Sequence, residues 1–192
     1  MADNHRLGVI EFKGAEDTSN THSIGARIEA ICRDAWDGSN NDADLQFYTT
    51  NGTTESKVLT LDADKDATFA GNVVVTGAAD GIIHTNTGTV TQGTNITTGV
   101  TLNATSGVIT THATAINADE NVQFTVTNST CKTTSVILLT MQDENTVNNK
   151  QLACAIHTVA NGSFKISIVN PHSATSTSAT ASKIHFLIVN PS

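Results

Sequence analysis

The segment VVVTGAADGIIH, residues 73–84, has the residue types of a dinucleotide-binding turn. Thr76, Gly77 and Gly81 match three of the four fixed positions of the pattern T-G-x-x-x-G-x-G, and Ile83 stands at the fourth. In such a turn the glycines let the backbone approach a pyrophosphate, which binds at the N-terminus of the next helix. Residues 84–107 are rich in glycine and β-branched residues and do not favour a helix. We therefore interpret the segment as a strand that runs into a loop.

Three aspartates have the spacing of a calcium loop. Asp62, Asp64 and Asp66 follow one another at every second position, but Ala67 replaces the expected glycine and Val73 the expected bidentate glutamate. The sequence therefore favours a turn between two strands. Metal binding remains an alternative in a trimer, where three copies of the cluster would gather near an axis.

The cysteines and histidines do not form a recognisable site. Cys32, Cys131 and Cys154 cannot all pair within one chain, and their separations match no zinc ribbon. We expect them to be buried apolar residues in a protein assembled in a reducing cytoplasm. Cys154 and His157 lie three residues apart in an expected strand, so their side chains would leave from opposite faces. We expect no metal and no cofactor.

Hydrolysis of a polysaccharide would need paired carboxylates in a groove. The only candidates are the cluster from Asp62 to Asp66 and the pair Asp143 and Glu144. The single tryptophan, Trp36, is predicted to pack over a hairpin rather than to stack on a ligand. No nucleophile elbow or phosphate-binding loop occurs, so we expect no enzymatic activity and assign no catalytic residue.

Alternating apolar and polar residues predict strands over the first eighty residues. In SIGARIEAI the apolar positions and the charged positions fall on opposite faces: Ile24, Ala26, Ile28 and Ala30 against Arg27 and Glu29. LQFYTT ends at Asn51 and Gly52, which is a strong hairpin signal. KVLTL is expected to pair with LQFYTT beyond this turn. ATFA and NVVVTG are expected to add two strands. Residues 1–80 are thus predicted to form a meander or a β-shaft.

A glycine-rich junction at residues 78–90 leads to a second domain, residues 81–192. Seven to eight strands are expected there, in the segments GVTLNA, GVITTHATAI, NVQFTVTN, SVILLTMQ, QLACAIHTVA, SFKISIVN and KIHFLIVN. Short strands with Gly or Asn turns are typical of an antiparallel β-sandwich or jelly roll. Pro171 and Pro191 each end a strand in the repeated tetrad Ile-Val-Asn-Pro, and the polar residues 172–182 are predicted to form an exposed loop.

The composition limits the possible partners. The 192 residues carry a formal net charge of −8, which disfavours nucleic acid and anionic membranes. Only 4% are aromatic, which favours stability through oligomerisation over one deep core. No apolar run is long enough to span a bilayer, and MADNHRLG lacks the apolar segment of a signal peptide, so we expect a soluble protein.

Two stretches resemble bacteriophage fibres, especially those of marine and cyanobacterial phages. The first follows the strand units G-x-I-x-F, A-x-I-E-A and L-x-F-x-T of their repeated segments, here Gly8, Ile10, Phe12, Ala26, Ile28, Glu29, Ala30, Leu45, Phe47 and Thr49. The second is similar to a terminal domain of phage and prophage fibres, at residues 88–92, 99–103, 124–129 and 162–164. Together the two stretches cover most of the chain.

The resemblance implies a homotrimeric virion protein, assembled in the host cytoplasm, with an intertwined N-terminal shaft and a C-terminal β-sandwich tip. Such a tail fibre or spike would contact other virion proteins and bind a polysaccharide or protein on the host surface. The alternative is a capsid decoration or head-fibre protein, judged by its contact with the shell. Fibres of this type are usually much longer, so the sequence is either a section of a longer fibre or a short protein that docks elsewhere.

Overall fold

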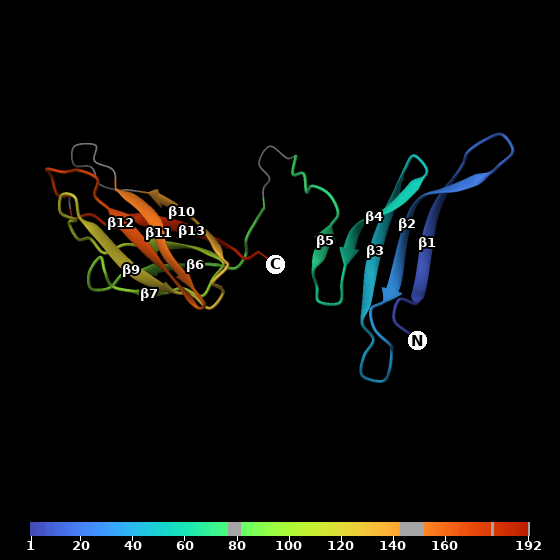
Figure 1. The fold of residues 1–192 in the computed structure, drawn as a ribbon, viewed down its shortest axis with the longest axis horizontal. Helices are drawn as coiled ribbons and strands as arrows, with labels where there is room; N and C mark the ends of the chain where they lie inside the picture. Colours follow the sequence, from blue (N-terminus) through green and yellow to red (C-terminus); the bar gives the residue numbers. More distant parts are fainter. Residues whose placement is uncertain (77–81, 143–151, 178, 192) are drawn as a thin grey trace. The chain divides into compact units, whose positions relative to one another are not determined.

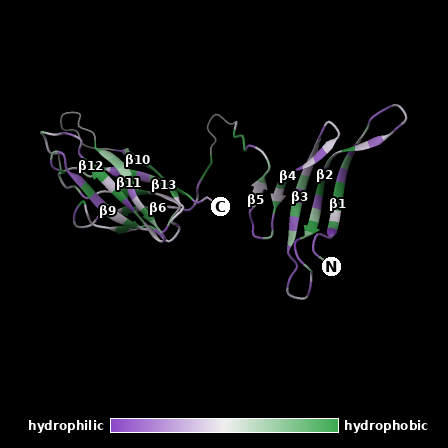
Figure 2. Cartoon of the chain, viewed as in Figure 1, coloured by the Kyte–Doolittle hydropathy of each residue, from purple (hydrophilic) through white to green (hydrophobic). Residues whose placement is uncertain are grey.

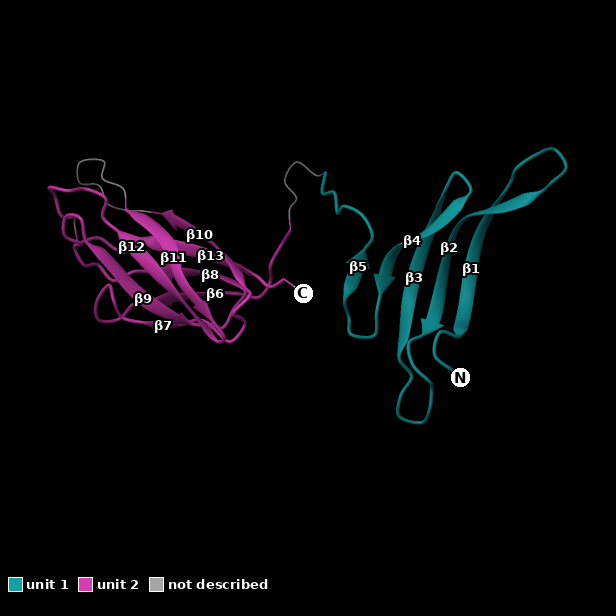
Figure 3. Cartoon of the chain, viewed as in Figure 1, with its two compact units in different colours: residues 1–81 teal, residues 82–192 magenta. Residues whose placement is uncertain are grey.

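The computed structural model describes residues 1–76, 82–142, 152–177 and 179–191 of the chain. The chain divides into two compact units, Met1–Gly81 (unit 1) and Ile82–Ser192 (unit 2), which Figure 3 colours separately. Every regular element in the described residues is a strand (Figure 1), so the predicted all-β class is confirmed. No helix long and apolar enough to cross a membrane occurs in this described part of the chain.

Unit 1 is a five-stranded antiparallel meander. Its strands are β1 (Arg6–Ala15), β2 (His22–Cys32), β3 (Ala43–Asn51), β4 (Thr54–Leu61) and β5 (Ala67–Phe69). They pair in chain order, β1-β2-β3-β4-β5. Each strand thus hydrogen-bonds the next along the chain, as short connections between antiparallel neighbours allow.

The hairpin predicted at Asn51 and Gly52 is confirmed. Asn51 is the Cα partner of Thr54, so Gly52 and Thr53 form a two-residue connection between β3 and β4. Gly52 has φ +63° and Thr53 does not have a positive φ, which is the pattern of a type II′ turn. Glycine at the first central position takes this conformation without a steric penalty.

The strand predicted for NVVVTG is wrong over its described residues, 72–76. Val73, Val74 and Val75 are exposed and belong to no strand. β-branched residues favour a strand only when a neighbouring strand supplies hydrogen bonds and packing, and no strand of the described residues pairs with these valines. The end of the segment, Gly77, and the start of the predicted junction lie outside the described residues. The junction's far end, expected to reach Val90, is instead part of a strand that begins at Thr87.

Unit 2 contains two four-stranded sheets. Its strands are β6 (Thr87–Thr91), β7 (Val100–Thr101), β8 (Ser106–Thr110), β9 (Asn121–Thr127), β10 (Val136–Gln142), β11 (Ala153–Ala160), β12 (Ser163–Val169) and β13 (Lys183–Val189). One sheet has the order β10-β13-β8-β6 and the other the order β11-β12-β9-β7. From β6 to β11 the chain alternates between the two sheets.

The prediction of a purely antiparallel domain is wrong for two strand pairs. β6 pairs with β8 in parallel, and β7 pairs with β9 in parallel. Parallel neighbours need a crossover connection. The connection from β6 to β8 contains β7, which belongs to the other sheet. In the same way, the connection from β7 to β9 contains β8.

The two sheets of unit 2 share one hydrophobic core. Phe164 of β12 and Phe186 of β13 come from different sheets, and their rings meet edge to face with centroids 5.5 Å apart. The other buried members include Ile109, Val126 and Ile166, all fully buried. Figure 2 shows apolar and polar residues alternating along these strands. The low aromatic content therefore does not prevent a deep core in this unit.

The loop at residues 172–182 is not simply exposed, contrary to the prediction. Thr177 is buried and exchanges two hydrogen bonds with Ile116: the Ile116 N–H donates to its hydroxyl at 2.8 Å, and its own N–H donates to the Ile116 carbonyl at 2.9 Å. Ser182 is also buried and donates its N–H to the Thr111 hydroxyl. These bonds pair backbone polar groups with partners outside a sheet. The strand β8 itself ends at Thr110, earlier than predicted.

Candidate functional site

The sheet of unit 1 has one apolar face and one charged face. Cross-strand Cα partners share a face, so the pairing register assigns each residue. Ile10 pairs with Ile28, Ile28 with Phe47, Phe47 with Leu59, and Leu59 with Phe69, which makes one apolar row across all five strands. We call "the apolar face" the set Gly8, Ile10, Phe12, Ala26, Ile28, Ala30, Leu45, Phe47, Thr49, Leu59, Leu61, Ala67 and Phe69.

The apolar face is open to solvent in the single chain. Ile10, Phe12 and Phe69 are 61%, 54% and 51% exposed. Cys32 is the only buried apolar residue among the described residues of unit 1, and the core cluster lies entirely in unit 2. Glu29, on the charged face, is by contrast only 4% exposed. Unit 1 therefore buries the Glu29 carboxylate, while Ile10, Phe12 and Phe69 of its apolar face are more than half exposed.

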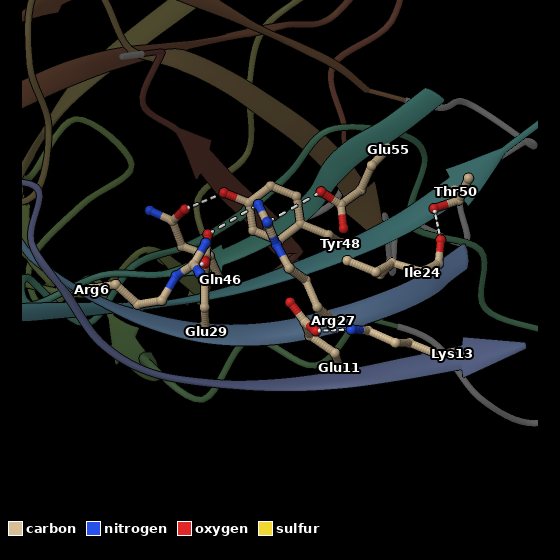
Figure 4. Close-up of polar contacts among 10 residues, drawn as sticks. All are labelled: Arg6, Glu11, Lys13, Ile24, Arg27, Glu29, Gln46, Tyr48, Thr50 and Glu55. Atoms are coloured by element: carbon tan, nitrogen blue, oxygen red, sulfur yellow. Dashed lines mark hydrogen bonds and ion pairs between the residues drawn. The ribbon is translucent and has the colours of Figure 1, made fainter. Parts of the chain in front are cut away.

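Arg27 is the centre of the charged face (Figure 4). Its guanidinium lies 3.2 Å from a carboxylate oxygen of Glu29 and 3.3 Å from one of Glu55. The guanidinium carbon also lies 4.0 Å from the centroid of the Tyr48 ring, in a cation–π contact. One side chain thus links β2, β3 and β4.

A second arginine completes the charge balance around Glu29. Arg6 Nε lies 2.8 Å from Glu29 Oε2, so two guanidinium groups face the one buried carboxylate. A carboxylate this buried is retained only when it is paired. On β1, Lys13 Nζ lies 2.8 Å from Glu11, and this contact lowers the pKa of the Glu11 carboxyl.

Tyr48 contacts its neighbours through both its ring and its hydroxyl. Burial, followed by the nearby Glu29 carboxylate, raises the pKa of the Tyr48 phenol above its usual value. The hydroxyl donates to the Gln46 amide oxygen at 2.7 Å. The ring contact with Arg27 and the hydroxyl bond to Gln46 together fix the position of the Tyr48 side chain.

The described residues of unit 1 line hollows at two places. One hollow, of about 350 Å³, lies at the end of the sheet that carries the β1–β2 and β3–β4 connections. It is lined by Glu16, His22, Ser23, Ile24, Thr50, Gly52, Thr53 and Glu55. Its polar groups are engaged with one another: Ser23 donates to Glu16, and Thr50 donates to the Ile24 carbonyl at 2.8 Å. The other, of about 380 Å³, lies on the apolar face beside Gly8 and Ala30.

The aspartate cluster forms the predicted turn between β4 and β5. The Asp62 carboxylate accepts the Asp66 N–H at 3.0 Å, and Lys65 takes the positive φ of 74° that closes the turn. Asp64 lies 2.6 Å from a guanidinium nitrogen of Arg33. These contacts use two of the three carboxylates within one chain. No group of three or more His, Cys, Asp or Glu side chains is arranged to hold a metal among the described residues.

The other singled-out residues are not brought together. Cys154 faces inward from β11 and His157 is exposed at a bulge in the same strand, as predicted. Cys32 and Cys131 are buried and Cys154 is half-buried, all three as free thiols. Trp36 is half-buried and donates its indole N–H to the Asp42 carbonyl across the β2–β3 loop, which agrees with the predicted packing.

Two predicted candidates lie outside the described residues, namely the glycines of the dinucleotide-like pattern and the pair Asp143 and Glu144. The sequence reasoning missed the cluster around Arg27. The alternation in SIGARIEAI carried part of the signal, because it placed Arg27 and Glu29 on one face. Their partners Arg6, Tyr48 and Glu55 are distant in sequence and come together only through the strand register.

Comparison with protein-family models, with curated proteins and with solved structures gives no significant match to this chain.

Proposed function

We propose that the chain is a structural protein of a bacteriophage virion, a trimeric tail fibre or spike that attaches the particle to the host cell surface. The observation that carries this proposal is the uncovered apolar face of unit 1. A sheet without its own core is stable only when another surface covers it. A fibre built from several copies provides such a surface along its length.

Unit 1 would serve as the shaft and as the assembling part of the protein. Its motifs of the type G-x-I-x-F and L-x-F-x-T, which resemble fibre repeats, project their apolar residues onto one face. Among the described residues, the edge strands β1 and β5 of its meander each pair with one strand only. Association of copies would remove the liability of open strand edges.

Unit 2 would serve as the tip, with a β-sandwich architecture. Its two sheets pack around a core of their own, centred on Phe164 and Phe186, so the unit does not need other copies to bury its hydrophobic residues. Polar surface groups can hydrogen-bond sugar hydroxyls at a low desolvation cost. Weak binding at each tip would be strengthened by several linked copies, since linkage raises the effective concentration of each further site. No catalytic step is part of the proposal.

The first test is the native mass of the full chain, measured by light scattering during gel filtration. We expect three times the 20.1 kDa of one chain. A stable monomer over the accessible concentration range would contradict the proposal, because the apolar face would then have no partner.

The second test locates the protein on the particle. Antibodies against the chain are expected to label the tails of intact virions that carry its gene. Label confined to the head would instead establish the capsid decoration or head-fibre alternative. A depolymerase assay on host capsular polysaccharide is expected to release no product.

A further inference from the structure

We propose that the apolar face of unit 1 binds the same face of another copy of this chain, and that the hollow beside Gly8 and Ala30 receives a side chain from that copy. The inference deepens the proposed assembly and rests on it only for the number of copies. The occupant is a second copy, for three reasons that concern area, shape and charge.

The uncovered area suits a stable protein interface. Ile10, Phe12 and Phe69 are more than half exposed, and Leu45 and Leu61 are 38% and 39% exposed. Together these five residues leave roughly 500 Å² uncovered, at about 200 Å² for each large side chain. A standard interface buries about 800 Å² per partner, of which somewhat more than half is apolar. The face therefore supplies about the apolar area that one partner of such an interface needs.

The face has both a hollow and protruding side chains. The hollow of about 380 Å³ lies beside the small residues Gly8 and Ala30, next to Ile10 and Leu45. A Cβ atom added at Gly8 would meet no atom within 4 Å in the single chain. Phe12, four residues after Gly8 on β1, projects from the same face and is 54% exposed. The face thus carries the two complementary features that a self-associating surface needs.

The charge distribution favours an identical partner. All the residues of the apolar face are uncharged, although the chain as a whole has a formal net charge of −8. Two identical faces can therefore meet without like-charge repulsion. Arg27 and Glu29 lie on the opposite face of unit 1, where Arg27 and Arg6 contact Glu29. A partner recognised by charge would be expected on that face instead.

Cysteine footprinting of the full chain tests the inference. The variant Ile10→Cys places a thiol on the apolar face, and the matched variant Thr68→Cys places one on the opposite face of an edge strand; both positions are exposed in the single chain. If copies pack through the apolar face, the thiol at position 10 alkylates about tenfold or more slowly than the thiol at position 68. The unmodified chain gives the background from its native cysteines.

Gly8→Val provides an independent test of the hollow. A β-branched residue suits a strand, and the space around Gly8 is open within the chain, so the substitution does not harm an isolated sheet. If a second copy fills the hollow, the variant lowers the native mass at a concentration where the unmodified chain is assembled. A matched variant, Thr68→Val, is expected to keep the native mass.

The outcomes separate this inference from the proposed function. A trimer in which positions 10 and 68 react equally fast, and in which Gly8→Val has no effect, overturns the inference and leaves the fibre proposal standing. A monomer in which position 10 is protected also overturns it, because the cover then comes from the same chain. A monomer in which position 10 is unprotected contradicts both proposals.

Discussion

The Arg27 guanidinium lies over the ring of Tyr48, its Cα partner on the neighbouring strand, at 4.0 Å from the ring centroid. The stacked guanidinium also reaches Glu29 and Glu55. A planar group that is weakly hydrated can stack and form ion pairs at the same time, which an ammonium group does less well. The charged face of unit 1 depends on this one side chain.

Arg27→Ala is expected to destabilise unit 1 by about 3 kcal/mol, because it leaves the buried Glu29 carboxylate with only Arg6 as a partner. Arg27→Lys keeps the charge but loses the stacked fork, and it is expected to cost about 1 kcal/mol. Urea unfolding followed by Trp36 fluorescence measures both, since the only tryptophan of the chain lies in unit 1. Lys57→Ala, at an exposed position on β4, is the control. Equal effects of Arg27→Ala and Lys57→Ala would refute the role assigned to Arg27.

Gly107→Ala is expected to destabilise unit 2 by about 2 kcal/mol, because its new methyl group has no room. A Cβ at Gly107 would lie 2.7 Å from the Gly88 carbonyl oxygen and 2.7 Å from a Leu102 methyl carbon. Gly88 and Gly107 are Cα partners in the parallel pair β6–β8, so the clash falls on the pairing itself. Thermal unfolding followed by far-UV circular dichroism gives the difference.

Gly93→Ala is the matched control for this change. Gly93 is exposed, and an added Cβ would meet nothing within 4 Å. Its effect should stay within about 0.5 kcal/mol. If both variants unfold at the same temperature, the close packing of β6 on β8 is not a stabilising feature.

Asn170→Ala is expected to destabilise unit 2 by about 2 to 3 kcal/mol, because it removes the hydrogen-bond donor of three carbonyl groups, of which that of Ile116 is buried. The Asn170 amide nitrogen lies 3.1 Å from the Ile116 carbonyl oxygen, 2.9 Å from that of Asn117 and 3.0 Å from that of Thr175. Asn190 has the same place in the second Ile-Val-Asn-Pro tetrad but is exposed. Asn190→Ala should therefore cost less than half as much, and chemical denaturation of both variants would reveal a reversed order.

The Cys154 thiol is expected to react with iodoacetamide more slowly in the native chain than in the urea-unfolded chain. Burial raises the pKa of this thiol, so at a given alkaline pH a smaller fraction is the reactive thiolate. The pH at which half the maximal rate is reached should lie higher for the native chain. Cys154→Ser identifies the signal, because Cys32 and Cys131 are buried. A native profile that coincides with the unfolded one would contradict the assignment.

Strand positions and turns follow from short-range rules and were predictable. Alternation over Ala26–Ala30 assigns the two faces of β2 because a strand has a period of two, and Gly52 permits the tight turn after Asn51. The apolar residues of the motifs G-x-I-x-F, A-x-I-E-A and L-x-F-x-T fall on one face for the same reason. The valines at 73–75 show the limit of this reasoning, because their propensity for a strand is realised only beside a partner strand.

The strand order within unit 2 was not predictable from these rules. The parallel pairs β6–β8 and β7–β9 depend on which sheet each strand joins, and that choice follows from how side chains distant in sequence fill one core. The burial of Thr177 has a similar origin, since its partner Ile116 lies 61 residues earlier in the chain. A polar composition alone indicates a surface loop.

The amino-acid sequence thus determines which side of each strand is apolar, because side-chain direction alternates locally along the backbone. Only the tertiary structure decides whether that side is covered. In unit 2 the apolar sides of two sheets meet at Phe164 and Phe186 and close a core. In unit 1 the same alternation produces the row from Ile10 to Phe69, and the described residues of the unit form one sheet only. Whether an apolar face is covered depends on contacts between distant segments, which a local pattern does not encode.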